Sequence, residues 1–89
     1  MPERRAVIAA SVGLHARPAM LFTQAVAETG LPVTIARPGG EPVDAGSILF
    51  VMSLGVPSGE EVTLAAEGEG ADAALDGLVE LLATDLDAP

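Results

Sequence analysis

Residues 13–19 read Gly-Leu-His-Ala-Arg-Pro-Ala, and this stretch predicts where the chain turns into its first helix. Pro18 suits the first turn of a helix, because its missing N–H needs no partner there and its fixed φ is close to helical. Arg17 precedes the proline and is therefore biased away from helical backbone. We expect the helix to begin within one or two residues of Arg17, with His15 at its start.

The residues on either side of this stretch extend the pattern. After it, apolar residues recur at helical spacing over about three turns: Ala19, Phe22, Ala25 and Val26. Gly30 then supplies a helix stop. Before it, residues 4–9 form a short apolar and partly β-branched run that predicts a strand, and residues 11–13 end that strand.

The rest of the chain predicts three further strands and two further helices. Strands are expected at 33–37, around 42–43 and at 61–66. The run 47–54 fits a strand or a helix on periodicity alone, but Ser47 as an N-cap and Gly55 just beyond the end favour a short helix. Asp72 suits the first turn of the last helix, whose apolar stripe is Ala71, Ala74, Leu75, Leu78 and Leu82.

The predicted order is strand-helix-strand-strand-helix-strand-helix. Four strands of alternating pattern, with helices that cover one face, predict an α+β fold of two layers. This is an open-faced sandwich with a four-stranded antiparallel sheet, three helices on one face and solvent on the other. Eighty-nine residues suffice for one core, so residues 1–89 are expected to form a single domain.

Composition narrows the classes of function. The formal charge is −9, and the four arginines are scattered among thirteen acidic residues, which argues against nucleic-acid binding. The chain has no cysteine, no signal-peptide core and no apolar run near the roughly 20 residues that span a bilayer. We therefore expect a soluble, cytoplasmic protein that binds neither membrane nor nucleic acid. Nothing in the chain requires more than a monomer.

His15 and Arg17 are the residues best suited to chemistry. A neutral imidazole is a usable nucleophile near neutral pH, and the positive end of a helix favours the neutral ring. The unpaired N–H groups of that helix end can hold phosphoryl oxygens, and the Arg17 guanidinium can neutralise their charge. The pair could therefore accept and release a phosphoryl group without a metal, a cofactor or a general base.

Other interpretations of the histidine stay open on the residues alone. His15 could simply flank the helix, since signals from one residue are weak. A metal site would need a second histidine or a cysteine, and the chain has neither. A Ser-His-Asp triad with Ser11 or Ser53 is conceivable, but no G-x-S-x-G motif supports it.

The stretch 13–19 resembles the active-site motif of HPr, the family of histidine-containing phosphocarriers in the bacterial sugar phosphotransferase system. A second stretch resembles the regulatory-serine helix of that family: residues 44–48 (Asp-Ala-Gly-Ser-Ile) followed by 52–56 (Met-Ser-Leu-Gly-Val). The two motifs have the family's usual separation. Length and element order agree over essentially the whole chain.

This resemblance implies that His15 accepts a phosphoryl group on Nδ1 from enzyme I, which phosphoenolpyruvate charges, with Arg17 assisting. His15 would then pass the group to IIA domains of sugar permeases, as a phosphoryl-transfer intermediate rather than a stand-alone enzyme. The resemblance also implies a partner-binding face on the first two helices, formed by Ala16, Met20, Ile48, Leu49 and Met52. An apolar face beside the nucleophile would keep water from the labile phosphoryl group.

Ser47 and three departures from the family pattern leave alternatives open. In part of the family the serine matching Ser47 is phosphorylated by a dedicated kinase, in addition to its role as an N-cap. Gly46 replaces a frequent lysine, Phe50 makes the binding face more apolar, and the charge of −9 is more acidic than in many relatives. The alternatives are a carrier of a nitrogen-related or regulatory phosphotransferase branch, or a non-carrier regulatory module controlled through Ser47.

Overall fold

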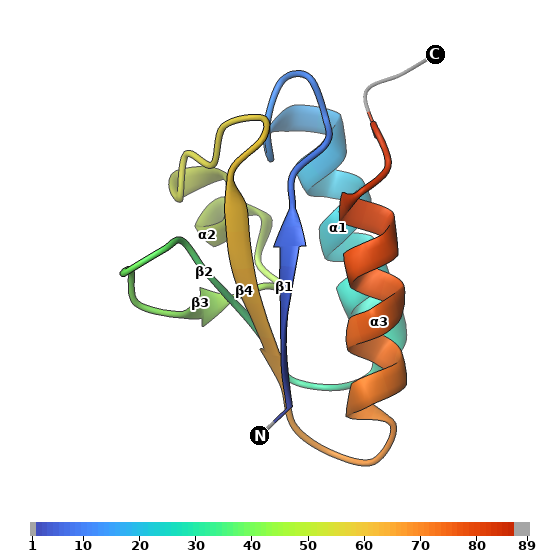
Figure 1. Ribbon diagram of the computed structural model, residues 1–89. Coiled ribbons are helices and arrows are strands. Elements are labelled where there is room, and N and C mark those ends of the chain that lie inside the picture. Colours follow the sequence, from blue (N-terminus) through green and yellow to red (C-terminus); the bar gives the residue numbers. More distant parts are fainter. Residues whose placement is uncertain (1, 87–89) are drawn as a thin grey trace.

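The computed structural model describes residues 2–86, which form four strands and three helices in the predicted order (Figure 1). The elements are β1 (Glu3–Val7), α1 (Ala16–Thr29), β2 (Val33–Ala36), β3 (Val43–Asp44), α2 (Ile48–Ser53), β4 (Glu61–Ala66) and α3 (Ala71–Leu82). Within this part of the chain, none of the helices has the length and apolar character that a membrane span requires.

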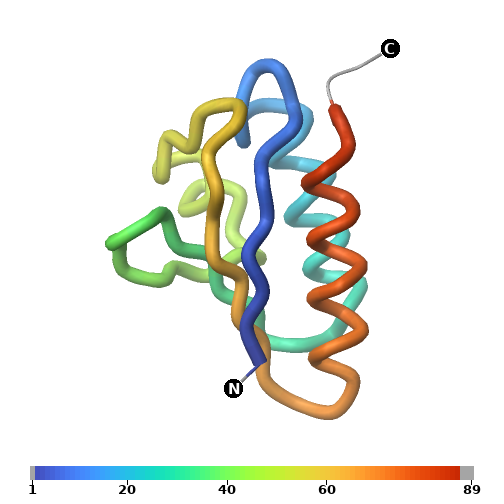
Figure 2. Tube along the Cα trace, viewed as in Figure 1, coloured from blue at the N-terminus to red at the C-terminus, as the bar shows by residue number. Residues whose placement is uncertain are grey.

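The four strands form one antiparallel sheet in the order β1-β4-β2-β3. The last strand in the sequence, β4, therefore lies between β1 and β2. The register pairs Ala6 with Val62 and Ile35 with Leu64, so these four side chains share one face of the sheet. The helices cover that face and leave the other open, as the ribbon and the chain trace show (Figure 1, Figure 2). The predicted open-faced α+β sandwich is confirmed.

One apolar core fills the space between the sheet and the helices. Its largest members are almost fully buried: Phe22, Ile8, Leu14, Ile35, Leu64, Leu75 and Leu82. The short helix α2 contributes only Val51 to the set of fully buried residues. Because α2 has six residues and buries one of them, much of its surface faces solvent.

Several predicted boundaries differ in the structure by one or two residues, and the first strand and the first helix show the larger differences. The first strand ends at Val7 rather than at residue 9, because the chain leaves the sheet there and the Ala9 amide donates to the Leu82 carbonyl at the end of α3. The first helix has 14 residues, about one turn more than predicted, because it begins at Ala16 and continues to the Gly30 stop.

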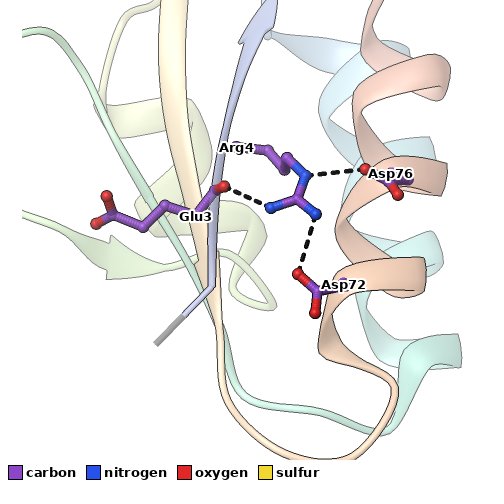
Figure 3. A network of polar contacts seen from close by, with 4 residues as sticks. All are labelled: Glu3, Arg4, Asp72 and Asp76. Atoms are coloured by element: carbon purple, nitrogen blue, oxygen red, sulfur yellow. Dashed lines mark hydrogen bonds and ion pairs between the residues drawn. The ribbon is translucent and has the colours of Figure 1, made fainter.

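An ion-pair network ties the edge strand β1 to α3 (Figure 3). The Arg4 guanidinium donates to Asp76 and to Asp72, each at 2.9 Å, and to the Glu3 carbonyl at 2.8 Å. The hydrogen bonds to Asp76 and Asp72 raise the pKa of Arg4. Both carboxylates lie largely in solvent, so the network orients the two elements more than it stabilises them.

Candidate functional site

The backbone on the N-terminal side of His15 is held in place. The Leu14 amide donates to the Val56 carbonyl at 2.9 Å, and the Leu14 side chain is buried in the core. Gly13 has φ +78°, and a β-carbon at this position would collide with the Val56 carbonyl oxygen, so only glycine fits. His15 follows in an extended conformation as the N-cap residue of α1, and its side chain is exposed. The loop thus fixes the backbone and leaves the imidazole accessible.

Ala16, directly after His15, adopts the left-handed conformation with φ +52°, alone among the described residues other than glycine. This conformation costs an L-residue about 1 kcal/mol. It persists because the chain is anchored on both sides, by the buried Leu14 before it and the buried Pro18 and Ala19 after it. Sequence reasoning missed this strained turn, since an alanine carries no signal for positive φ.

The start of α1 presents donors and a positive charge next to His15. The first N–H groups of a helix have no partner within it, and Pro18 has none to donate, so the Ala16 and Arg17 amides are the donors at this end. The Arg17 side chain is exposed and has no carboxylate within ion-pair distance among residues 2–86. The other three arginines each pair with an acid. These groups together suit an anion with several oxygens, such as a phosphoryl group.

An exposed apolar surface lies on α1 and α2, which pack against each other. Its members, called the apolar face below, are Met20, Ile48, Leu49 and Phe50. Leu49 is the most exposed, at 76%. Ala16 is exposed as well, whereas Met52 is half-buried and packs against the core, so it offers a partner less surface than predicted. Val12 is also exposed but was not predicted, because one apolar residue in a loop has no periodicity to reveal it.

Ser47 caps α2 as predicted. Its Oγ accepts a hydrogen bond from the Phe50 amide at 3.4 Å. The turn before it is shaped by Asp44, whose Oδ1 accepts from the Gly46 amide at 2.8 Å and whose carbonyl accepts from the Ser47 amide at 3.2 Å. The Ser47 hydroxyl therefore lies at the start of the helix that carries most of the apolar face.

The part of the chain that the structure describes has a surface groove but no metal-binding cluster. No cluster of three or more histidine, cysteine or acidic side chains could hold a metal ion there. A shallow groove of about 500 Å³ lies between the C-terminal half of α1 and the outer side of α3. None of the predicted site residues lines this groove. His15 and Arg17 lie at the start of α1, whereas the apolar face lies on α1 and on α2, which packs against it.

The chain matches a known protein family over almost its whole length. A family model described as "PTS HPr component phosphorylation site" matches residues 2–84. The chain belongs to the HPr family. The phosphocarrier protein HPr of Streptomyces coelicolor is 51% identical over 87 residues, which cover 98% of this chain and 94% of that protein. The HPr-like protein Crh of Bacillus subtilis is 40% identical over 78 residues, covering 88% and 91%.

A solved HPr structure agrees with this assignment. The crystal structure of HPr-C-His from Thermoanaerobacter tengcongensis matches with a TM-score of 0.90 at 36% identity, and the match covers 100% of this chain and 99% of that one. The resemblance that the two sequence motifs predicted is confirmed. The match supports the general phosphocarrier role of the HPr family for this chain.

Proposed function

We propose that this HPr-family protein accepts a phosphoryl group on Nδ1 of His15 from enzyme I, which phosphoenolpyruvate charges, and donates it to IIA domains of sugar permeases. One observation carries the proposal. The exposed His15 imidazole belongs to the N-cap residue of a 14-residue helix, beside an arginine without a carboxylate partner in residues 2–86. In this role the protein is a transfer intermediate rather than a stand-alone enzyme, and it needs no cofactor.

The transfer is a substitution at phosphorus. The lone pair of Nδ1 forms the P–N bond while the bond from phosphorus to the donor breaks, and the bonding electrons leave with the donor. In the neutral tautomer with its hydrogen on Nε2, Nδ1 is already free to attack, so no general base is required. The Arg17 guanidinium and the first amides of α1 offset the charge on the phosphoryl oxygens. The second transfer reverses these events when the acceptor nucleophile of a IIA domain takes the phosphorus.

The apolar face supports docking by both partners in turn. Enzyme I or a IIA domain that covers Met20, Ile48 and Leu49 would exclude water from the P–N bond during the exchange. Because both partners would use the same surface, the carrier must release the first before it binds the second. We propose that the protein acts in the cytoplasm, as a monomer that shuttles between partners.

The decisive experiment is phosphorylation in vitro by purified enzyme I, magnesium and phosphoenolpyruvate, followed by intact mass analysis. We expect one acid-labile phosphoryl adduct in the wild type and none in His15→Ala. The variant should remain folded by circular dichroism, since the His15 side chain is exposed and makes no capping hydrogen bond. A wild type that stays unlabelled while a control HPr is labelled would refute the proposal, as would an adduct that persists in His15→Ala.

Arg17→Ala tests the role of the guanidinium, with Arg5→Ala as its control. Both variants remove one exposed positive charge, but Arg5 lies on β1 in a loose 3.8 Å pair with Glu61. We expect Arg17→Ala to slow transfer about tenfold without abolishing it, and Arg5→Ala to leave the rate nearly unchanged. Rapid-quench measurement of the phosphorylation rate compares the two. Equal rates would remove the role assigned to Arg17.

A regulatory function through Ser47 is a second candidate, favoured by the 40% identity to Crh of Bacillus subtilis, which is described as the catabolite repression HPr of that organism. A phosphate on Ser47 would add about two negative charges beside the apolar face and weaken docking. The presence of both His15 and Arg17 favours carriage over a purely regulatory module. Incubation with a serine kinase and ATP distinguishes the two sites, because phosphoserine is acid-stable and phosphohistidine is not. A carrier of a nitrogen-related branch would be phosphorylated faster by the enzyme I of that branch than by the enzyme I of the sugar branch.

A further inference from the structure

We propose that Arg37, which lies directly after β2, is a positioning residue that holds the His15 loop in place through the segment 54–60. The kinetic part of this inference rests on the proposed function, whereas the structural part rests on contacts within the chain alone. Arg37 touches no reacting group. It acts on the segment between α2 and β4, against which the loop of residues 8–15 rests.

The Arg37 guanidinium closes the segment 54–60 at both ends. Its Nε and Nη2 donate to Oε2 and Oε1 of Glu60, each at 2.7 Å, in the bidentate geometry that makes such pairs strong. Its Nη1 donates to the Leu54 carbonyl at 3.1 Å. Leu54 is the C-cap residue of α2, so the same guanidinium also binds the end of the helix that carries most of the apolar face.

The carboxylate that Arg37 binds is better sheltered than the two that Arg4 binds, whereas the two arginine side chains are similarly exposed, at 40% and 34%. The Glu60 side chain is 22% exposed, whereas Asp72 and Asp76 are 71% and 65% exposed. The Glu60 backbone is held as well, because its carbonyl accepts the Ile8 amide at 3.0 Å. Glu60 therefore gives Arg37 an anchor that does not swing freely in solvent.

The closed segment supports the residue that precedes His15. Val56, in the middle of the segment, is buried, and its carbonyl accepts the Leu14 amide at 2.9 Å. Gly13 packs so closely on that carbonyl that no β-carbon fits between them. The Gly59 amide donates to the Ile8 carbonyl at 2.7 Å, so the contact extends along the loop. A shift of the segment would move the start of α1, and small displacements of a reacting group are costly in rate.

Arg37→Met tests the inference, and Arg4→Met is its matched control. Each variant removes one guanidinium that joins separate elements, Arg4 with three partners and Arg37 with two, but of these two arginines only Arg37 contacts the segment 54–60. The first readout is hydrogen exchange of the Leu14 amide by NMR, which needs no phosphorylation. We expect this exchange to be about tenfold faster in Arg37→Met and unchanged in Arg4→Met.

The second readout is the rate of phosphorylation by enzyme I. We expect it to fall about tenfold in Arg37→Met and to stay within about twofold of wild type in Arg4→Met. Arg37→Lys keeps the positive charge but loses the bidentate guanidinium, and Glu60→Gln keeps the side-chain shape but loses the negative charge. The phosphorylation rates of both variants should therefore lie between those of Arg37→Met and Arg4→Met. These two variants also carry the test if Arg37→Met fails to fold.

The outcomes separate this inference from the proposed function. Unchanged Leu14 exchange in the Arg37 and Glu60 variants would overturn it, whatever the phosphorylation rates. Faster exchange of the Leu14 amide with an unchanged phosphorylation rate would show that Arg37 holds the loop but does not affect transfer, which would overturn the kinetic part of the inference. If the wild type is not phosphorylated at all, the proposed function fails, and Leu14 exchange still decides whether Arg37 positions the loop.

Discussion

At Gly13, an unusual backbone conformation coincides with a close tertiary contact. Its φ of +78° is one that most residues avoid, and the Val56 carbonyl occupies the space of a β-carbon. Gly39 has almost the same φ, +72°, yet nothing lies within 4 Å of its β-carbon position. Substitution of Gly39 by alanine therefore adds backbone strain alone, whereas substitution of Gly13 adds strain and a steric collision.

Gly13→Ala is predicted to lower the free energy of unfolding by more than Gly39→Ala. Both variants incur about 1 kcal/mol for the left-handed conformation. Gly13→Ala also displaces the Val56 carbonyl and so weakens its hydrogen bond with the Leu14 amide, which contributes about 1 kcal/mol more. Urea denaturation of both variants measures the difference. Equal losses would contradict the close approach at Gly13.

The residues of the candidate site differ in how far the sequence predicted them. His15 and Arg17 lie at a helix start as expected, because Pro18 marks that start in the sequence. The left-handed Ala16 between them was not expected. It arises because the loop before it and the helix after it are each fixed by burial, and the residue between must join them.

At the scale of elements, α2 shows how strongly a short helix depends on its ends. It has six residues, and most of its surface is exposed. Its periodicity fitted a strand or a helix, and the cap and stop residues decided correctly for a helix. In β4, burial does not follow alternation throughout. Ala65 points to the open face of the sheet but is buried, since its small side chain lies between Glu3 and Thr34 on the neighbouring strands.

Ser47→Ala is predicted to cost about 0.5–1 kcal/mol of stability, because it removes the N-cap acceptor of α2. The low end is expected, since the hydrogen bond is long at 3.4 Å. Ser53→Ala is the control: Ser53 Oγ donates within the same helix to the Phe50 carbonyl, and alanine is the better helix former. Thermal unfolding should therefore show a loss for Ser47→Ala only. A comparable loss in Ser53→Ala would argue against the capping role.

The pair of Arg37 and Glu60 predicts a pH dependence of stability. The hydrogen bonds from Arg37 hold the pKa of Glu60 below its ordinary value of 4.5. A carboxyl group whose folded pKa is depressed stabilises the fold above its unfolded pKa and loses that contribution as the pH falls through the folded pKa. The stability difference between wild type and Glu60→Gln should be full at pH 7 and shrink below pH 4.5. Denaturation curves that differ equally at pH 7 and pH 3 would contradict this assignment.

At the scale of the whole molecule, the exposed apolar residues are unevenly distributed. Four of those with large side chains form the apolar face, whereas Val7, 47% exposed, lies on β1 and points to the open face of the sheet. The carboxylates give the chain its charge of −9, yet no acidic residue occurs within α2. This distribution fits a docking surface on α1 and α2, surrounded by a solvated acidic surface.

Leu49→Ser is predicted to raise the KM of enzyme I for this protein as its substrate severalfold. Little change in stability is expected, because Leu49 is 76% exposed in the free protein. Val7→Ser makes a similar change on the open face of the sheet and should leave the KM unchanged. Steady-state phosphorylation with each variant as substrate measures both. A KM equally affected by the two variants would contradict a docking role for the apolar face.

The sequence by itself determined the features that depend on a residue and its near neighbours. The start of α1 close to Pro18, the stops at Gly30 and Gly55, and the cap at Ser47 are of this kind. Each follows from a local φ preference or a hydrogen bond that spans a few residues. These local signals gave the order of strands and helices, and that order predicted the fold class.

Only the tertiary structure decided which distant residues meet. Alternation marks each strand but is the same in all of them, so it could not predict that β4 lies between β1 and β2. Nor could it predict that Arg37 binds Glu60, or that the Val56 carbonyl receives the Leu14 amide. These contacts follow from burial of one shared core, which brings segments together according to how their apolar faces pack and not according to their positions in the chain.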